Sequence, residues 1–137
     1  RKGKAASMLM VGSLIMIACH LSFAFLLPMF PSKVFAVAII AILGVSFSLV
    51  PAALWPSVPK IIDERILGSA YCVIFWIQNW GLLLVPVIIG KVLDVTGGYT
   101  MPMVIFSSFG VVALFMGMLL KVEDKKKGYG LEEPNIK

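Results

Sequence analysis

The sequence predicts an all-α membrane protein with four transmembrane helices. Hydrophobic residues make up 60% of the 137 residues and charged residues 14%, whereas soluble domains are about half apolar and a quarter charged. The mean hydropathy is correspondingly high, at +0.99. The apolar residues form four continuous runs, each long enough to cross roughly 30 Å of hydrocarbon as a helix. Transmembrane barrels instead show short alternating segments, so we expect helices.

The four runs follow one another with short connections. We expect the spans at about residues 5–27, 34–55, 67–89 and 102–120. A tight turn containing Pro28 and Pro31 should close the first span, and Gly90, Asp94 and Gly97 should form the turn after the third. Residues 122–137 are too polar to insert and are expected to form a charged cytoplasmic tail.

The stretch from Trp55 to Asn79 carries the clearest functional signal. Two prolines, Pro56 and Pro59, are expected to stop the second helix. A charged hinge follows them: Lys60, Asp63, Glu64 and Arg65. The third helix then carries the amides of Gln78 and Asn79 in an otherwise apolar run. Because amides at membrane depth are costly unless they face protein or a water-filled cavity, this pair indicates a functional position.

Basic residues predict the orientation. Most of them fall on one side of the predicted spans: Arg1, Lys2, Lys4, Lys60, Arg65, Lys121, Lys125, Lys126 and Lys127. The opposite side holds only Lys33 and Lys91. Cytoplasmic loops of membrane proteins carry such an excess, so both ends of the chain should be cytoplasmic. This asymmetry accounts for the net charge of +5, and no nucleic-acid partner is expected.

The third helix has a mixed amide and aromatic face. A step of 100° per residue puts four side chains on that face: Tyr71, Phe75, Gln78 and Leu82. Asn79 lies at its edge, and Trp76 and Trp80 point roughly the opposite way. Such a face suits a cavity that binds a polar ligand by hydrogen bonding and stacking. Alternatively, Gln78 and Asn79 only bond to neighbouring helices.

The second helix offers further candidates on one face: Gly44, Ser48, Pro51 and Trp55. Pro51 removes a backbone donor and leaves the carbonyl of Phe47 without its usual partner. Such positions serve as hinges or ligands where they line a cavity, so Pro51 is a candidate hinge and Ser48 and Trp55 are cavity candidates. Packing alone also explains small residues and prolines in membrane helices, and Trp55 also fits an interfacial belt.

The remaining residues suggest structural roles. Ser107, Gly110, Leu114 and Gly117 form a small-residue stripe that predicts a helix-packing surface. We expect neither a disulfide nor a metal site from Cys19 and Cys72, and no cofactor. No nucleophile with a base indicates an enzyme.

Two short motifs resemble the major facilitator superfamily. Arg1-Lys2-Gly3-Lys4 resembles the end of its loop motif, G-x-x-x-D-R-x-G-R-R, with Arg1, Gly3 and Lys4 on the Arg, Gly and basic positions. The stretch 90–94, followed by Gly97, is similar to the G-x-x-x-D-x-x-G turn after the eleventh helix. The order of these motifs among four spans implies helices nine to twelve of a twelve-helix major facilitator fold. The resemblance gives Arg1 and Lys4 the role of a cytoplasmic latch.

More narrowly, ALWPSVPK, LGSAY and the IQN at residues 77–79 resemble the branch that includes the lysosomal dipeptide transporter and its bacterial relatives. The resemblance implies two six-helix halves that open alternately around a midplane site, with helices ten and eleven lining the cavity. It implies transport of small polar solutes, possibly dipeptides. The expected partners are the lipid bilayer, the solute and the missing N-terminal helices, and the expected location is a bacterial plasma (inner) membrane.

One alternative remains open. A stand-alone four-helix accessory or assembly protein would have the same composition. The chain begins with a basic half-motif and without Met, so we expect a fragment of a transporter. No Asp or Glu lies in the four spans, which leaves proton coupling and uniport both possible.

Overall fold

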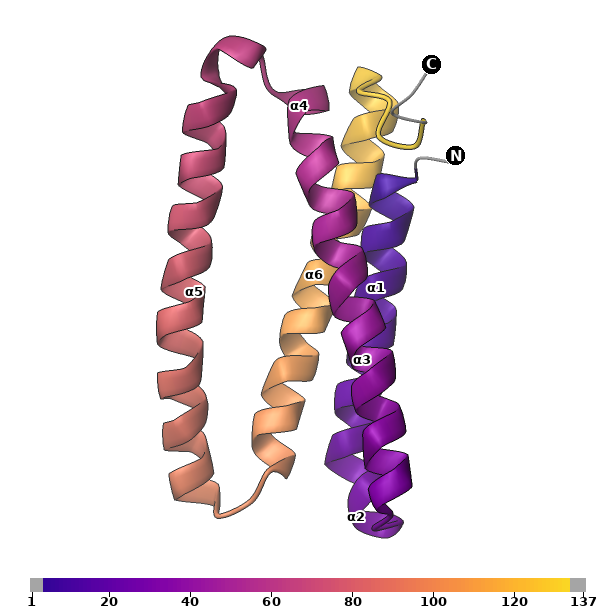
Figure 1. Ribbon diagram of the computed structural model, residues 1–137, viewed down its shortest axis with the longest axis vertical. Helices are drawn as coiled ribbons and strands as arrows, with labels where there is room; N and C mark the ends of the chain where they lie inside the picture. The colour runs from indigo at the N-terminus through magenta and orange to yellow at the C-terminus, as the bar shows by residue number, and fades with distance from the viewer. Residues whose placement is uncertain (1–3, 134–137) are drawn as a thin grey trace.

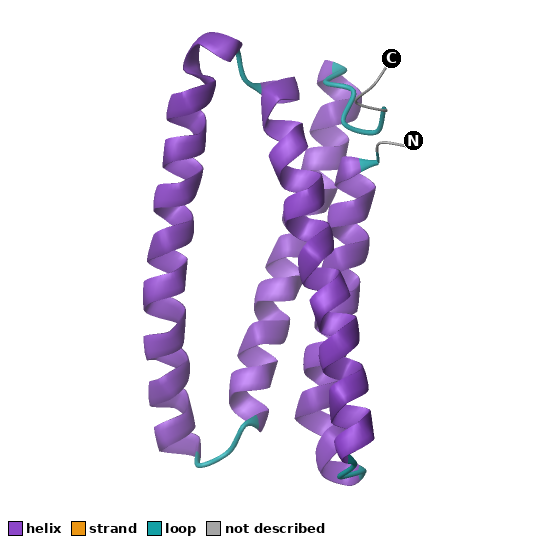
Figure 2. Cartoon of the chain, viewed as in Figure 1, coloured by secondary structure: helices purple, strands orange, loops and turns teal. Residues whose placement is uncertain are grey.

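The four apolar runs form four long helical rods joined by short turns (Figures 1 and 2). The structure is a computed structural model in which residues 4–133 are described, and no strand occurs in that range. The rods span Ala5–Met29, Lys33–Ile61, Glu64–Thr96 and Thr100–Lys127. All four are long and apolar enough to cross a membrane, which confirms the predicted fold class.

The first rod contains a widened turn near its end. α1 (Ala5–Leu21) leads into a π-helical turn, Ser22–Leu26, and then into α2 (Leu27–Met29). Within this turn the Leu27 N–H bonds to the Ser22 carbonyl, five residues back. Pro28 follows, and a proline ring clashes with the carbonyl four residues earlier in a regular helix. The wider turn accommodates it, so Pro28 lies inside the helix rather than in the expected turn.

The second rod also continues through its prolines. α3 (Lys33–Leu54) passes into a 3-10 turn, Trp55–Ser57, and then into α4 (Val58–Ile61). The α-helix itself ends at Leu54, close to the predicted end of the span, but Pro56 and Pro59 do not stop the rod as predicted, because helical turns continue to Ile61. Each proline stands in the first turn of a new short helical segment, where its missing N–H costs little. The rod changes its winding at residues 55–57 and ends only after Ile61.

The last two rods extend past the predicted apolar spans. After a 3-10 turn, Glu64–Ile66, α5 (Leu67–Thr96) ends at Gly97, whose φ is 64°. α6 (Thr100–Lys127) ends at Gly128, whose φ is 66°. Glycine adopts this left-handed conformation without a Cβ clash. Gly90 and Asp94, expected in a turn, lie inside α5, because Gly97 is the first left-handed residue after it. The expected charged tail likewise begins as helix.

α1 packs tightly between α3 and α6. Ser46 Oγ of α3 donates a hydrogen bond of 2.6 Å to the Gly12 carbonyl of α1. On the other side, Gly110 and Gly117 of α6 are buried against α1, where an added Cβ at Gly110 would lie 2.6 Å from Ile17. The buried stripe of Ser107, Gly110 and Gly117 confirms the predicted packing surface.

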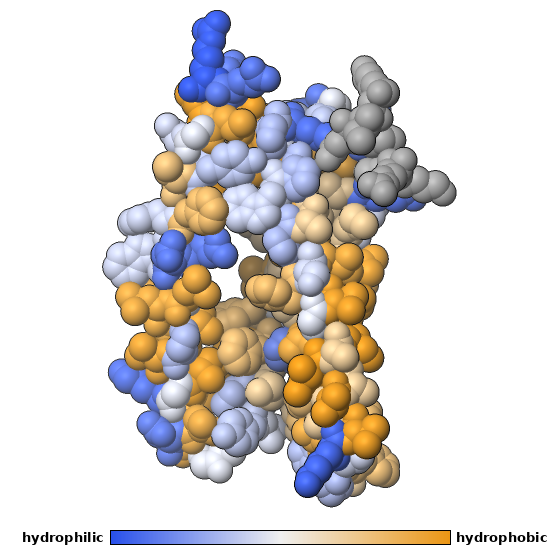
Figure 3. Space-filling view, viewed as in Figure 1, coloured by the Kyte–Doolittle hydropathy of each residue, from blue (hydrophilic) through white to orange (hydrophobic). Residues whose placement is uncertain are grey.

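α5 stands apart from this three-helix group (Figure 1). None of its residues is buried, whereas a third of the residues in the apolar stretch of the first rod are buried. In Figure 3 apolar side chains cover much of the middle of the visible face, and most of the strongly hydrophilic ones lie toward the two ends. In lipid, exposed apolar surface is compatible with a stable fold. Both sides of α5 are therefore left exposed within this chain.

The small-residue contact predicts a difference between two glycines. Gly110→Ala should destabilise the full-length protein by about 1–3 kcal/mol, because the new Cβ overpacks the contact with Ile17. Gly44→Ala is the matched control, since nothing lies within 4 Å of a Cβ there and alanine favours a helix by about 0.5–1 kcal/mol. Thermal melting in detergent measures both. Equal melting temperatures would contradict the tight packing of α6 on α1.

Candidate functional site

Three of the predicted site residues form an aromatic cluster at the end of the molecule where the termini lie. The rings of Trp55 and Phe75 are stacked, with centroids 4.9 Å apart, and the Trp55 and Tyr71 centroids are 5.6 Å apart. Trp55 comes from the 3-10 turn of the second rod, and the other two come from the face of α5 that the sequence indicated. The cluster therefore joins α5 to the altered segment of the second rod.

A hydrogen bond explains why Tyr71 lies there. In a regular helix the carbonyl of Trp55 would accept from the N–H of residue 59, but Pro59 has none. The Tyr71 hydroxyl donates to this carbonyl at 3.1 Å. A side chain of α5 thus replaces the backbone donor that the second rod lacks. Sequence reasoning missed this pair, although the four-residue spacing of Trp55 and Pro59 signals a free carbonyl.

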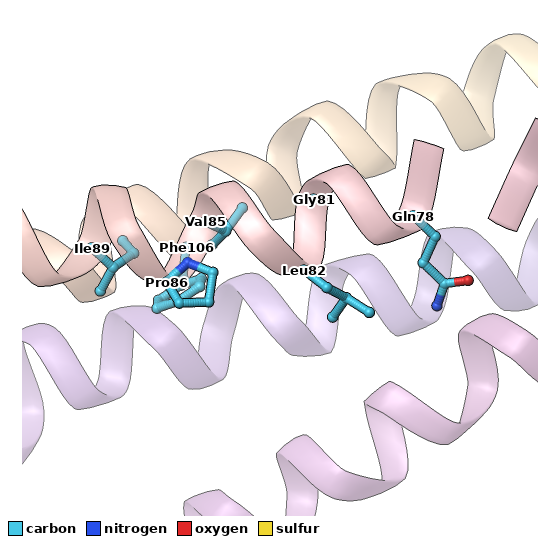
Figure 4. Close-up of a pocket in the computed structure, with 7 residues that line it drawn as sticks. All are labelled: Gln78, Gly81, Leu82, Val85, Pro86, Ile89 and Phe106. Atoms are coloured by element: carbon cyan, nitrogen blue, oxygen red, sulfur yellow. The ribbon is translucent and has the colours of Figure 1, made fainter. Parts of the chain in front are cut away.

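Gln78 lies at the rim of an apolar cavity between α5 and α6 (Figure 4). The cavity has a volume of about 590 Å³ and is lined by Gln78, Gly81, Leu82, Val85, Pro86, Ile89 and Phe106. The side chains of Gln78 and Leu82 point to the same side of α5 in Figure 4. Pro86 leaves the Leu82 carbonyl without its helical donor, so this face offers two polar groups in apolar surroundings.

Asn79 lies on a different face from Gln78. It lines a second, smaller hollow of about 250 Å³ together with Trp76, Trp80 and Leu83. Its Nδ2 donates to the carbonyl of Phe75 at 2.7 Å, within its own helix. The 100° step between neighbouring residues separates the two amides, and the structure groups Asn79 with the indoles rather than at the edge of the Gln78 face.

The candidates on α3 lie away from its packed side. Ser48 is exposed and donates to the carbonyl of Gly44 at 2.9 Å, whereas Ser46, two residues earlier, is buried against α1. Pro51 lies inside α3, and the helix continues through it. The change of winding comes later, at residues 55–57, so the structure places the irregular backbone next to the aromatic cluster rather than at Pro51.

Phe106 of α6 is a cavity residue that sequence reasoning missed. Its ring lies 5.4 Å from that of His20 in α1, and the His20 Nδ1 donates to the carbonyl of Met16 at 2.7 Å. These contacts give His20 a structural role as a bridge from α1 toward the cavity wall. The apolar stretch around Phe106 gives no sign of this contact, because a phenylalanine in a membrane helix more often faces lipid.

The loop-motif residues fall at the edge of the described chain. Arg1 and Gly3 lie outside the described residues, and Lys4 is exposed just before α1. Within residues 4–133 the one ion pair is Lys127–Glu123, at 2.9 Å, so Lys4 forms no ion pair with that part of the chain. The N- and C-terminal ends lie at the same end of the molecule (Figure 1).

Comparisons with known proteins agree with this architecture. The chain is 41% identical to the lysosomal dipeptide transporter MFSD1 of zebrafish (Danio rerio) over 91 residues and 37% identical to its human counterpart over 90 residues, each match covering 66% of this chain. The chicken protein of the same name is 42% identical over 78 residues, or 55% of the chain. The matches cover 20%, 19% and 17% of those proteins, respectively. The chain therefore spans about a fifth of the length of the curated relatives it matches.

These matches are consistent with a fragment of a major facilitator superfamily protein. No family profile and no solved structure matches it, so the assignment depends on these relatives and on the four long apolar helices. Major facilitator proteins are transporters rather than enzymes, as the sequence indicated. The matches do not favour the stand-alone accessory protein.

The bond between Tyr71 and Trp55 predicts a coupling that a double-mutant cycle can measure. Tyr71→Phe should cost about 0.5–1.5 kcal/mol of stability. The cost should fall in a Pro59→Ala background, because alanine supplies the missing N–H. Thermal stability of the parent, both single variants and the double variant measures the coupling, with Tyr99→Phe, at a side chain 70% exposed, as control. An identical cost in both backgrounds would show that the hydroxyl does not replace the backbone donor.

Proposed function

We propose that this chain is the C-terminal part of a major facilitator transporter that moves small polar solutes, such as dipeptides, by alternating access. The observation that carries the proposal is the succession along α5 of Tyr71 and Phe75, which contact Trp55, and Gln78, which lies at the rim of an apolar cavity. A few placed polar groups in a largely apolar cavity are typical of small-molecule sites. The relatives that match are named as dipeptide transporters.

Within this site Gln78 is the proposed solute ligand. Its amide nitrogen can donate two hydrogen bonds and its amide oxygen can accept. These groups suit the peptide bond or the termini of a small polar solute. The cluster of Trp55, Tyr71 and Phe75 provides an aromatic wall on the same face of α5. Ser48 belongs to the proposed site only if the solute also reaches the exposed side of α3. Asn79, turned toward the indoles, contributes to packing.

Movement between the two open states requires a bend in the helices. We assign Pro51 and the 3-10 turn at Trp55–Ser57 to this role, because both interrupt regular hydrogen bonding in the second rod. The bond from Tyr71 makes the geometry of that turn depend on the position of α5. The proposed latch role of Arg1 and Lys4 acts at the same end of the molecule.

The orientation and the membrane are part of the proposal. Lys60, Lys121 and the run at residues 125–127 lie at the end that carries both termini, whereas Lys33 and Lys91 lie toward the other end. The excess of basic residues supports a cytoplasmic location for the first end. A bacterial inner membrane remains a prediction from the sequence, and the names of the relatives, all lysosomal, do not support it.

We place the group that would couple transport to an energy source outside this part of the protein. The four apolar spans contain no Asp or Glu, and an intramembrane carboxylate is the usual group for proton coupling. If protons drive transport, we propose that the titrating carboxylate lies in the upstream helices.

Two neighbouring amides provide the test of the site. In the full-length protein, Gln78→Ala should raise the KM for dipeptide uptake about tenfold. A change of this size corresponds to the loss of about one charged or well-placed hydrogen bond to the solute. Asn79→Ala, the matched control, should leave KM within about twofold because its amide bonds within its own helix. Uptake into proteoliposomes measures both.

Trp80→Leu, on the face of Asn79, should also leave the KM unchanged. An unaltered KM in Gln78→Ala would make Gln78 a packing residue. An effect at Asn79 or Trp80 as large as at Gln78 would show that the wrong face of α5 has been assigned to the solute.

A further inference from the structure

The chain folds back on itself after α6. Gly128, with a φ of 66°, ends the helix, and Gly130, with a φ of 70°, turns the chain again. Residues 128–133, called here the C-terminal segment, therefore run back over the end of the helices instead of extending into solvent. The sequence predicted only a charged tail here, because two glycines in a polar stretch do not show where the chain goes next.

Leu131 anchors this segment in the helical group. It is fully buried, its N–H donates to Asp124 Oδ1 at 3.0 Å, and its carbonyl accepts from the N–H of Ala5 at 3.0 Å. Ala5 is the first residue of α1, and the N–H groups in the first turn of a helix have no partner within the helix. Leu131 also lines a small cavity of about 70 Å³ with residues of α1 and of the second rod, among them Ala53 and Pro56.

Glu132 adds a charged contact at the start of α1. Its two carboxylate oxygens accept from the N–H and the Oγ of Ser7, both at 2.9 Å. A carboxylate at a helix N-terminus is favourable because of the free N–H groups and the helix dipole. Lys121 of α6 donates to the same Ser7 Oγ at 2.8 Å. The C-terminal segment, α1 and α6 thus share one hydrogen-bond network.

Lys60 ties the second rod to the same segment. Its Nζ donates to the carbonyls of Gly130 at 2.6 Å and Glu133 at 2.9 Å. Lys60 lies in α4, which follows the altered winding at residues 55–57 and directly precedes the connection to α5. The second rod and α5 otherwise meet through the aromatic cluster around Trp55. The C-terminal segment therefore contacts the part of the second rod that leads into the least packed helix.

We propose that the C-terminal segment is a built-in lock on the conformational change, which holds α4 against α1 and α6 and has to release Lys60 before α4 and α5 can move. This inference rests on the proposed function, because it assumes a transport cycle. Two features support a lock over a passive tail. Its anchor, Leu131, is buried and bonds to α1 and α6, and its contact with Lys60 is on α4, the segment that leads into the connection to α5.

A reversible crosslink tests the lock. In the full-length protein depleted of its other cysteines, Ser7→Cys and Glu132→Cys place thiols on two residues whose side chains are hydrogen-bonded, and a short cleavable thiol crosslinker that spans the gap left by the shorter side chain fixes the segment. Ser57→Cys, buried in the 3-10 turn that leads into α4, is then labelled with a water-soluble maleimide after crosslinking. Because movement of α4 would expose this position, we expect labelling of residue 57 to slow at least fivefold and to recover on cleavage. Equal labelling before and after cleavage would overturn the lock.

Two lysine variants give an independent test. Lys60→Met should speed labelling at residue 57 at least threefold without the crosslinker, whereas Lys125→Met, at an exposed lysine of α6, should not. Equal acceleration in both variants would count against the lock, and so would no acceleration in either. Neither readout needs a solute, so failure of the uncrosslinked protein to take up dipeptide would reject the proposed function separately. If uptake occurs, the crosslink should reduce its rate at least fivefold, and full-rate uptake would reject the lock.

Discussion

Backbone hydrogen bonding without water is the constraint on which this structure depends. A helix in lipid has to satisfy its own N–H and C=O groups, yet prolines interrupt three of the four rods. At two of the prolines the backbone is satisfied locally. The first rod widens into a π turn before Pro28, and in the second the Tyr71 hydroxyl takes the place of the donor that Pro59 lacks. The irregular backbone of this protein is thereby concentrated at positions where two rods meet.

The packing is uneven, and the unevenness has a physical origin. α1 and α3 approach closely where Ser46 faces Gly12, and α6 approaches α1 closely where Gly110 lies against Ile17. Van der Waals contact and interhelical hydrogen bonds drive helix association in lipid. α5 has no buried residue within this chain, and it contacts the second rod through the aromatic cluster and the Tyr71 hydroxyl. Small residues thus account for the tight three-helix group, and aromatic residues account for the contact of α5 with it.

The sequence predicted what depends on hydropathy and helical period. Four spans, the small-residue stripe of α6 and the pairing of Tyr71 with Phe75 on one face of α5 follow from these patterns alone. It did not predict that helical winding continues through Pro56 and Pro59, because a proline can either end a helix or begin the next one. Asn79 was expected at the edge of the Gln78 face and lies instead with the indoles of its own helix. Phe106 and Leu131 were missed for another reason: their contacts join segments far apart in the chain.

The bond between Tyr71 and Trp55 also bears on how this protein can change during evolution. A proline at position 59 leaves a carbonyl that the hydroxyl at position 71 satisfies, so each residue makes the other useful. Loss of the hydroxyl alone leaves the Trp55 carbonyl without a donor. Loss of the proline alone restores a backbone N–H at position 59, so the hydroxyl is no longer needed. The two positions should therefore vary together among homologues, as a correlated pair separated by two short helical segments and a charged connection.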